Sequence, residues 1–156
     1  MEQQTLGAAL EAEHREIDGG IEAYLAADGT GQDQPDTLVR SLAGLRRHIY
    51  LEEELLFPPL KRSGLMGPIF AMEREHGQLW NVMAGIDSSI ERGDSPGARA
   101  ACTELLRLLD KHNTMEETVI YAQADELLDE TASSSLGDFL DSGVLPADWS
   151  PRSARG

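Results

Sequence analysis

Four stretches of this chain repeat apolar residues every three to four positions, and each stretch carries one histidine on its apolar face. This period is typical of an α-helix with one buried side, because a strand would alternate at every second residue. Helices of about 20–30 residues with short connections pack as an antiparallel bundle. The chain is therefore predicted to be all-α, an up-down-up-down four-helix bundle with apolar stripes over residues 10–25, 38–56, 69–90 and 105–127.

Segments rich in glycine, proline and small polar residues separate these helices, at 28–35, 58–68 and 93–97. Such residues end helices and form turns, so we predict the three connections there. Beyond residue 130 the sequence becomes small and polar, apart from an apolar piece at 136–145 that is able to fold back on the bundle. We expect a bundle domain over 1–130, followed by a short, partly ordered C-terminal tail over 131–156.

The charge and the cysteine content argue against several functions. The chain has 28 Asp and Glu against 13 Lys and Arg, a formal net charge of −15. Such a surface repels phosphate and anionic lipid, so we expect no nucleic-acid and no membrane partner. Its single cysteine, Cys102, allows neither an internal disulfide nor a thiolate metal cluster. Without a signal-like N-terminus or a long apolar run, we expect a cytoplasmic monomer or weak homodimer.

The four histidines are predicted to share one level of the bundle interior. In antiparallel neighbours, residues equally far from the connecting turn lie side by side. That distance differs by about one residue, or about 1.5 Å of helix, within each of three pairs: His14 with His48, His48 with His76, and His76 with His112. Glu52 and Glu116 each follow a histidine by four residues, only about 40° around the helix, and therefore face the same interior.

Burial of each of these six imidazole and carboxylate groups without a partner would cost several kcal/mol. A single histidine on an apolar stripe is more often an ordinary core residue, but the joint pattern favours a metal centre. Imidazole and carboxylate without thiolate suit iron, manganese or zinc, and six donors with two bridging carboxylates suit a pair of ions. The candidate metal ligands are His14, His48, Glu52, His76, His112 and Glu116.

This pattern resembles the hemerythrin-like family, the HHE cation-binding domains, over roughly residues 8–128. The matching segments are EHREI with His14, HIYLEEELLFP with His48 and Glu52, REH with His76, and HNTMEE with His112 and Glu116. The resemblance implies two iron ions with an oxo or hydroxo bridge, held jointly by Glu52 and Glu116. It also implies chemistry with O2, peroxide or NO, while zinc or manganese are possible substitutes for iron.

The chain departs from the oxygen-carrying hemerythrins, which have five histidines and His-x-x-x-His on the third helix. Here Trp80 stands four residues after His76, and the carboxylate of the fourth helix is Glu116, at i+4, instead of an aspartate at i+5. The four-His, two-Glu set looks closer to proteins that repair iron centres and to regulatory or peroxide-reactive members. Fewer protein ligands leave open coordination, which favours reaction over reversible carriage.

Several other residues are weaker candidates. Three acidic residues are placed either to fill a ligand position or to hydrogen-bond an imidazole: Glu11, Asp18 and Glu73. Tyr50 and Tyr121 lie about 180–200° from the histidines on their helices, so neither is expected to ligate. Glu53 and Glu117 are expected on the solvated face, and their removal is expected to leave the metal in place.

Three functions fit the pattern. One is a di-iron oxidoreductase that reacts with O2, peroxide or NO and draws on an electron donor. The alternative is a metal-binding module for iron storage, or for sensing O2, redox state or iron, without turnover. A ferritin-like carboxylate bundle is the third, since Glu11-x-x-His14 and Glu73-x-x-His76 mimic its motif, but four inward histidines are two more than such a site uses.

Overall fold

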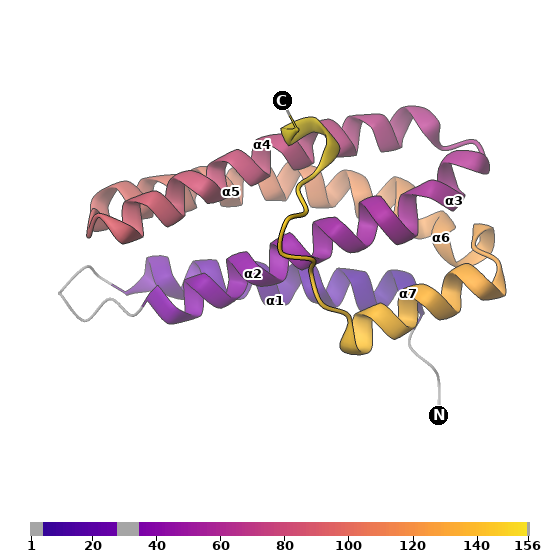
Figure 1. Cartoon of the computed structure of the whole chain (residues 1–156), viewed down its shortest axis with the longest axis horizontal. Helices are drawn as coiled ribbons and strands as arrows, with labels where there is room; N and C mark the ends of the chain where they lie inside the picture. Colours follow the sequence, from indigo (N-terminus) through magenta and orange to yellow (C-terminus); the bar gives the residue numbers. More distant parts are fainter. Residues whose placement is uncertain (1–4, 28–34, 156) are drawn as a thin grey trace.

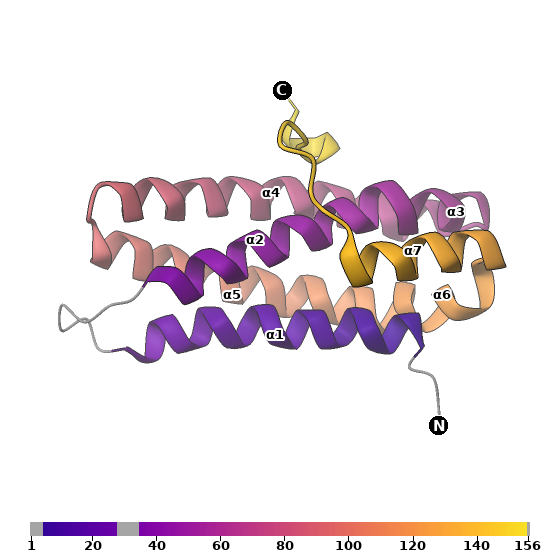
Figure 2. The same cartoon turned by 60° about the horizontal axis from the view of Figure 1, so that its bottom comes forward.

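The computed structural model describes residues 5–27 and 35–155. Within these ranges the chain is helical and has no strand. The long helices lie side by side along the long axis of the molecule, with short turns at its ends (Figures 1 and 2). The prediction of an all-α bundle is confirmed. Its elements are α1 (Leu6–Ala26), α2 (Pro35–Leu51), η1 (Glu52–Leu56), α3 (Phe57–Arg62), α4 (Met66–Glu91), α5 (Ser95–Met115), η2 (Glu116–Ile120), α6 (Tyr121–Leu127), α7 (Glu130–Ser142) and η3 (Arg152–Ala154).

Side-chain caps explain where several helices begin. Thr5, Asp94 and Asp129 each accept a hydrogen bond from the backbone N–H three residues later, at the starts of α1, α5 and α7. Such a cap satisfies one of the N–H groups that the first turn of a helix leaves free. Gly64 and Gly93 adopt φ angles of +105° and +70° in the turns before α4 and α5. Only glycine takes up this conformation at little cost.

The connection predicted at 58–68 is wrong in its first half. The helix continues through Pro58 and Pro59 to Arg62, and the chain turns at Ser63–Leu65 instead. The two prolines lie in the first turn of α3, directly after the π-helical turn η1, where a missing N–H costs little. The connection predicted at 28–35 lies outside the described residues, except for Pro35, which begins α2.

The interior consists of two apolar clusters with a polar layer between them. One cluster includes Ile21, Leu42 and Cys102, and the other includes Leu10 and Phe57. Cys102 is fully buried among apolar neighbours. Each buried large side chain contributes roughly 1.5–3 kcal/mol to folding. The apolar clusters therefore provide the stability that offsets a buried polar layer at mid-bundle.

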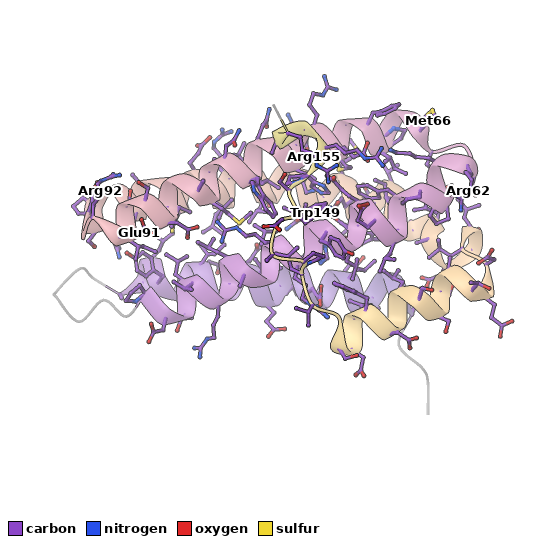
Figure 3. All side chains as sticks on the ribbon, viewed as in Figure 1. Arg62, Met66, Glu91, Arg92, Trp149 and Arg155 are labelled. Carbon is purple, nitrogen blue, oxygen red and sulfur yellow. The ribbon has the colours of Figure 1, made fainter. Side chains whose placement is uncertain are left out.

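The C-terminal part folds back over α2 and reaches α4 (Figures 1 and 2). Leu136 of α7 is fully buried in the second cluster, as the apolar piece at 136–145 suggested. After α7 the chain crosses the bundle near its middle, where Figure 3 shows Trp149 and Arg155, far from Arg92 at one end and Arg62 at the other. There η3 packs on Gly77, whose missing side chain makes room for Ser153. Arg47 donates to the carbonyl oxygens of Phe139, Leu140 and Gly143.

Two glycines of α4 test this tail contact. A methyl group at Gly77 would lie 3.0 Å from the backbone carbon of Ser153, whereas one at Gly85 would meet nothing within 4 Å. We expect Gly85→Ala to raise the free energy of unfolding by roughly 0.5–1 kcal/mol, because alanine favours helix. Gly77→Ala should lose that gain and make the tail more sensitive to protease. Equal stabilisation by both changes in urea unfolding would show that the tail does not dock there.

Candidate metal centre

The six predicted ligands meet in one buried layer. Each is at most 4% exposed. Their donor atoms form two groups, in each of which all atoms lie within 4.8 Å of one another. The structure thus brings together every residue that the sequence pattern selected, and their ligation of metal remains a prediction. The first group is His14, His48, Glu52 and Glu116, and the second is His76, His112, Glu52 and Glu116.

The first group has the spacing of a ligand shell. The Nε2 atom of His14 lies 3.1 Å from His48 Nε2 and 3.1 Å from Glu116 Oε1. His48 Nε2 lies 3.3 Å from Glu52 Oε2. Neighbouring ligands at ~2.0–2.2 Å from one ion, set at right angles, are about 3 Å apart. The imidazoles and carboxylates therefore already stand at the separations that a bound cation requires.

The second group repeats this arrangement with the other oxygen of each carboxylate. His76 Nε2 lies 3.1 Å from Glu52 Oε1 and 3.6 Å from Glu116 Oε2. His112 Nε2 lies 3.1 Å from Glu116 Oε2. Glu52 and Glu116 each direct one oxygen to each group. This is the arrangement by which a carboxylate bridges two ions.

Unpartnered atoms show that the second group fits a cation. His76 Nε2, Glu52 Oε1 and Glu116 Oε2 are buried and make no hydrogen bond, although they approach one another. An unsatisfied buried polar atom costs about 1–3 kcal/mol. All three belong to the second group, so one cation there would satisfy all of them. The imidazole and carboxylate set suits iron, manganese or zinc.

A ring of outer carboxylates holds the histidines in place. In each case a glutamate accepts a hydrogen bond from the Nδ1 atom of a histidine on a neighbouring helix. This contact leaves the Nε2 lone pair pointing into the layer, as metal ligation requires. The ring passes around the four long helices in order. Its pairs are Glu13 with His48 at 2.8 Å, Glu53 with His76 at 2.7 Å, Glu75 with His112 at 2.7 Å, and Glu117 with His14 at 2.8 Å.

This ring corrects the prediction for Glu53 and Glu117. Neither stands free on a solvated face: Glu53 is 1% exposed, and Glu117, 33% exposed, bonds His14. Each outer glutamate directly precedes or follows a ligand in the sequence, which is the signal that could have identified it. The weaker candidates contribute no such contact in the part of the chain described. The carboxylate of Glu73, for example, pairs with Lys61 at 2.9 Å.

Tyr121 also reaches the layer, contrary to the prediction. The π-helical turn η2 inserts one extra residue after Glu116, with the Tyr121 N–H bonded to the Glu116 carbonyl oxygen. This turns the following residues by about 100° relative to a regular helix. The Tyr121 side chain therefore points inward. Tyr50, by contrast, packs on Phe139 and Trp149.

The carboxylates control the protonation of the layer. Burial alone would lower the pKa of His48, but Glu52 and Glu13 raise it to about 10. Burial alone would also lower the pKa of His112, but Glu116 and Glu75 raise it to about 9. Metal ions bind imidazole only after its proton has left. Metal binding at His48 and His112 would therefore be an exchange of cations for protons.

An antiparallel bundle with two His/Glu groups that share both carboxylates fits the pattern of a metal-binding protein of the di-iron type. The comparisons agree with this class. The sequence model of the hemerythrin HHE cation-binding domain matches residues 5–124, so the chain belongs to the hemerythrin family. Comparison with curated proteins and with solved structures gave no match. Of the helices described, none has the length and apolar character to cross a membrane.

The pKa shifts predict how the metal-free protein responds to alkali. An imidazole whose pKa is raised by folding stabilises the fold fully below the unfolded value of ~6.5. That contribution is lost as pH rises through about 9 and about 10, the values for His112 and His48. We expect the Tm of chelator-treated protein to fall between pH ~7 and ~10. A Tm independent of pH over this range would contradict the assignment.

Loss of an outer carboxylate should weaken metal binding. Glu117→Ala frees the Nδ1 atom of His14, and we expect a ~10–100-fold loss of metal affinity. Glu126→Ala, on the exposed side of α6, is the matched control and should bind as tightly as the natural chain. Competition with a chelator measures both. Equal affinities for the two variants would show that the ring does not position the ligands.

Proposed function

We propose that the chain holds a pair of iron ions and reacts with O2, peroxide or NO. The observation that carries the proposal is the sharing of Glu52 and Glu116 by two groups that each have only two histidines. Each position then has four donor atoms, which leaves coordination positions for a small molecule, since such iron sites commonly take six ligands. Bound iron would supply those positions and the electrons for reduction. Repeated turnover would require an electron donor.

The surroundings of the layer support this use. Apolar clusters lie on both sides along the bundle axis and keep water away from the ions. Phe57 stacks on His76, with ring centroids 5.6 Å apart and planes 10° apart. A dry site strengthens the interactions of charged groups within it and limits side reactions.

A surface groove comes close to the layer. A groove of about 420 Å³ lies between α1 and α2, and its walls include Glu13 and Arg47. Glu13 accepts the hydrogen bond from His48 Nδ1, so the groove ends one side chain away from a ligand. Its size is sufficient for O2, NO or peroxide.

The same site would also serve storage or sensing, and reactivity separates these functions. We expect the ferrous protein to contain two irons per chain and to change its absorption rapidly on mixing with O2, peroxide or NO. His48→Ala and Glu116→Ala should lose one or both irons together with this response, while Glu126→Ala keeps both. Stopped-flow absorption and metal analysis measure the outcome. An iron-loaded protein that is inert to all three molecules would be a storage or sensing module instead.

A further inference from the structure

The two halves of the bundle repeat one arrangement of residues around the layer. Each half has Glu-His on its first long helix and His-x-x-x-Glu-Glu on its second. In both halves a π-helical turn, η1 or η2, begins at the first glutamate of the His-x-x-x-Glu-Glu motif. The equivalent pairs are Glu13-His14 with Glu75-His76, His48 with His112, Glu52-Glu53 with Glu116-Glu117, and Phe57 with Tyr121.

Phe57 and Tyr121 therefore occupy equivalent positions, five residues after a shared glutamate. In both turns the N–H of the aromatic residue bonds the carbonyl oxygen of that glutamate. Each ring then lies against a histidine of the other half. The Phe57 ring is 5.6 Å from that of His76, and the Tyr121 ring is 5.3 Å from that of His14. The two sides of the layer differ mainly by one hydroxyl group.

That hydroxyl contacts all four donor atoms of the first group. It lies 2.9 Å from His48 Nε2, 3.0 Å from His14 Nε2 and 3.1 Å from Glu116 Oε1. It also donates a hydrogen bond to Glu52 Oε2. Neighbouring ligands of one ion are about 3 Å apart, so the hydroxyl stands where a fifth ligand beside these four would stand.

The second group shows the arrangement without a hydroxyl. Its atoms His76 Nε2, Glu52 Oε1 and Glu116 Oε2 lack a hydrogen-bond partner. Their equivalents in the first group, on His14 and on the opposite carboxylate oxygens, all contact the Tyr121 hydroxyl. The two groups therefore have the same donor set, and only the first group has a phenol hydroxyl beside it.

We propose that Tyr121 is a fifth protein ligand at the metal position of the first group, and that the second position, beside Phe57, has one protein ligand fewer. The two positions are then inequivalent, and the second is the more open to a small molecule. The phenol releases its proton to solvent as its oxygen binds the ion, as other protein ligands do. This inference rests on the proposed function and refines it.

Absorption and resonance Raman spectra of the ferric protein test the proposal. A phenolate bound to ferric iron gives a visible charge-transfer band and enhanced phenolate vibrations. We expect both in the natural chain and their loss in Tyr121→Phe. The chain has three tyrosines, so Tyr50→Phe and Tyr24→Phe are matched controls that should keep both signals. Tyr121→Phe retains the ring, and circular dichroism checks that it folds.

The outcomes separate this proposal from the proposed function. Two irons per chain without a phenolate signal would overturn the role of Tyr121 and leave the iron pair standing. A signal that persists in Tyr121→Phe would also overturn it. If the chain takes up no iron, a zinc titration decides: zinc should produce the ultraviolet difference spectrum of ionised tyrosine in the natural chain and in Tyr50→Phe. Zinc binding without that spectrum, or no binding of either metal, would overturn the proposal.

Discussion

The burial of four imidazoles and two carboxylates in an otherwise apolar bundle is the interaction on which the rest of this structure depends. Glu52, His76 and Glu116 are fully buried or nearly so, and isolated charges at such depth cost several kcal/mol each. The fold meets this cost through pairing. Each imidazole nitrogen of His14 faces a carboxylate, one within the layer and one from the outer ring. The acidic ring thus supports the layer, and the negative charge of the chain is partly a requirement of the site.

Two local departures from regular helix give the layer its chemistry. The π-helical turns η1 and η2 begin at Glu52 and Glu116, the residues shared by both groups. A wider turn there rotates the next aromatic residue inward, so Phe57 and Tyr121 line the layer instead of the surface. Because both halves have the same π-helical turn, the difference that Tyr121 makes within the layer comes from side-chain identity. A symmetric scaffold can in this way hold two chemically different sites.

The sequence was sufficient to predict that the six side chains meet in one layer, because the direction and depth of a side chain follow from its position along a regular helix. His48 and Glu52 are four residues apart on one stripe, so the prediction that they face the same interior needed no tertiary information. Tyr121 could not be placed in this way, since a one-residue π insertion shifts every later position and leaves no compositional mark. The connection was wrongly predicted to begin at Pro58 for a related reason, because Pro58 and Pro59 follow such a π-helical turn.

Adjacency to a candidate ligand marks the outer glutamates in the sequence, but it does not say which histidine on another helix each of them contacts. The hydrogen bond from His48 to Glu13 depends on how α1 and α2 are rotated against each other, which is set by packing across the whole interface. The C-terminal tail depends on packing in the same way. The Arg152 N–H donates to Glu53 Oε1 at 3.1 Å, and Ser153 sits over Gly77. Glu53 is 1% exposed, whereas its equivalent Glu117 is 33% exposed. The tail therefore makes the two halves different at the surface, as Tyr121 does within the layer. It covers Glu53, the outer carboxylate that accepts the hydrogen bond of His76. His76 belongs to the group that has no phenol.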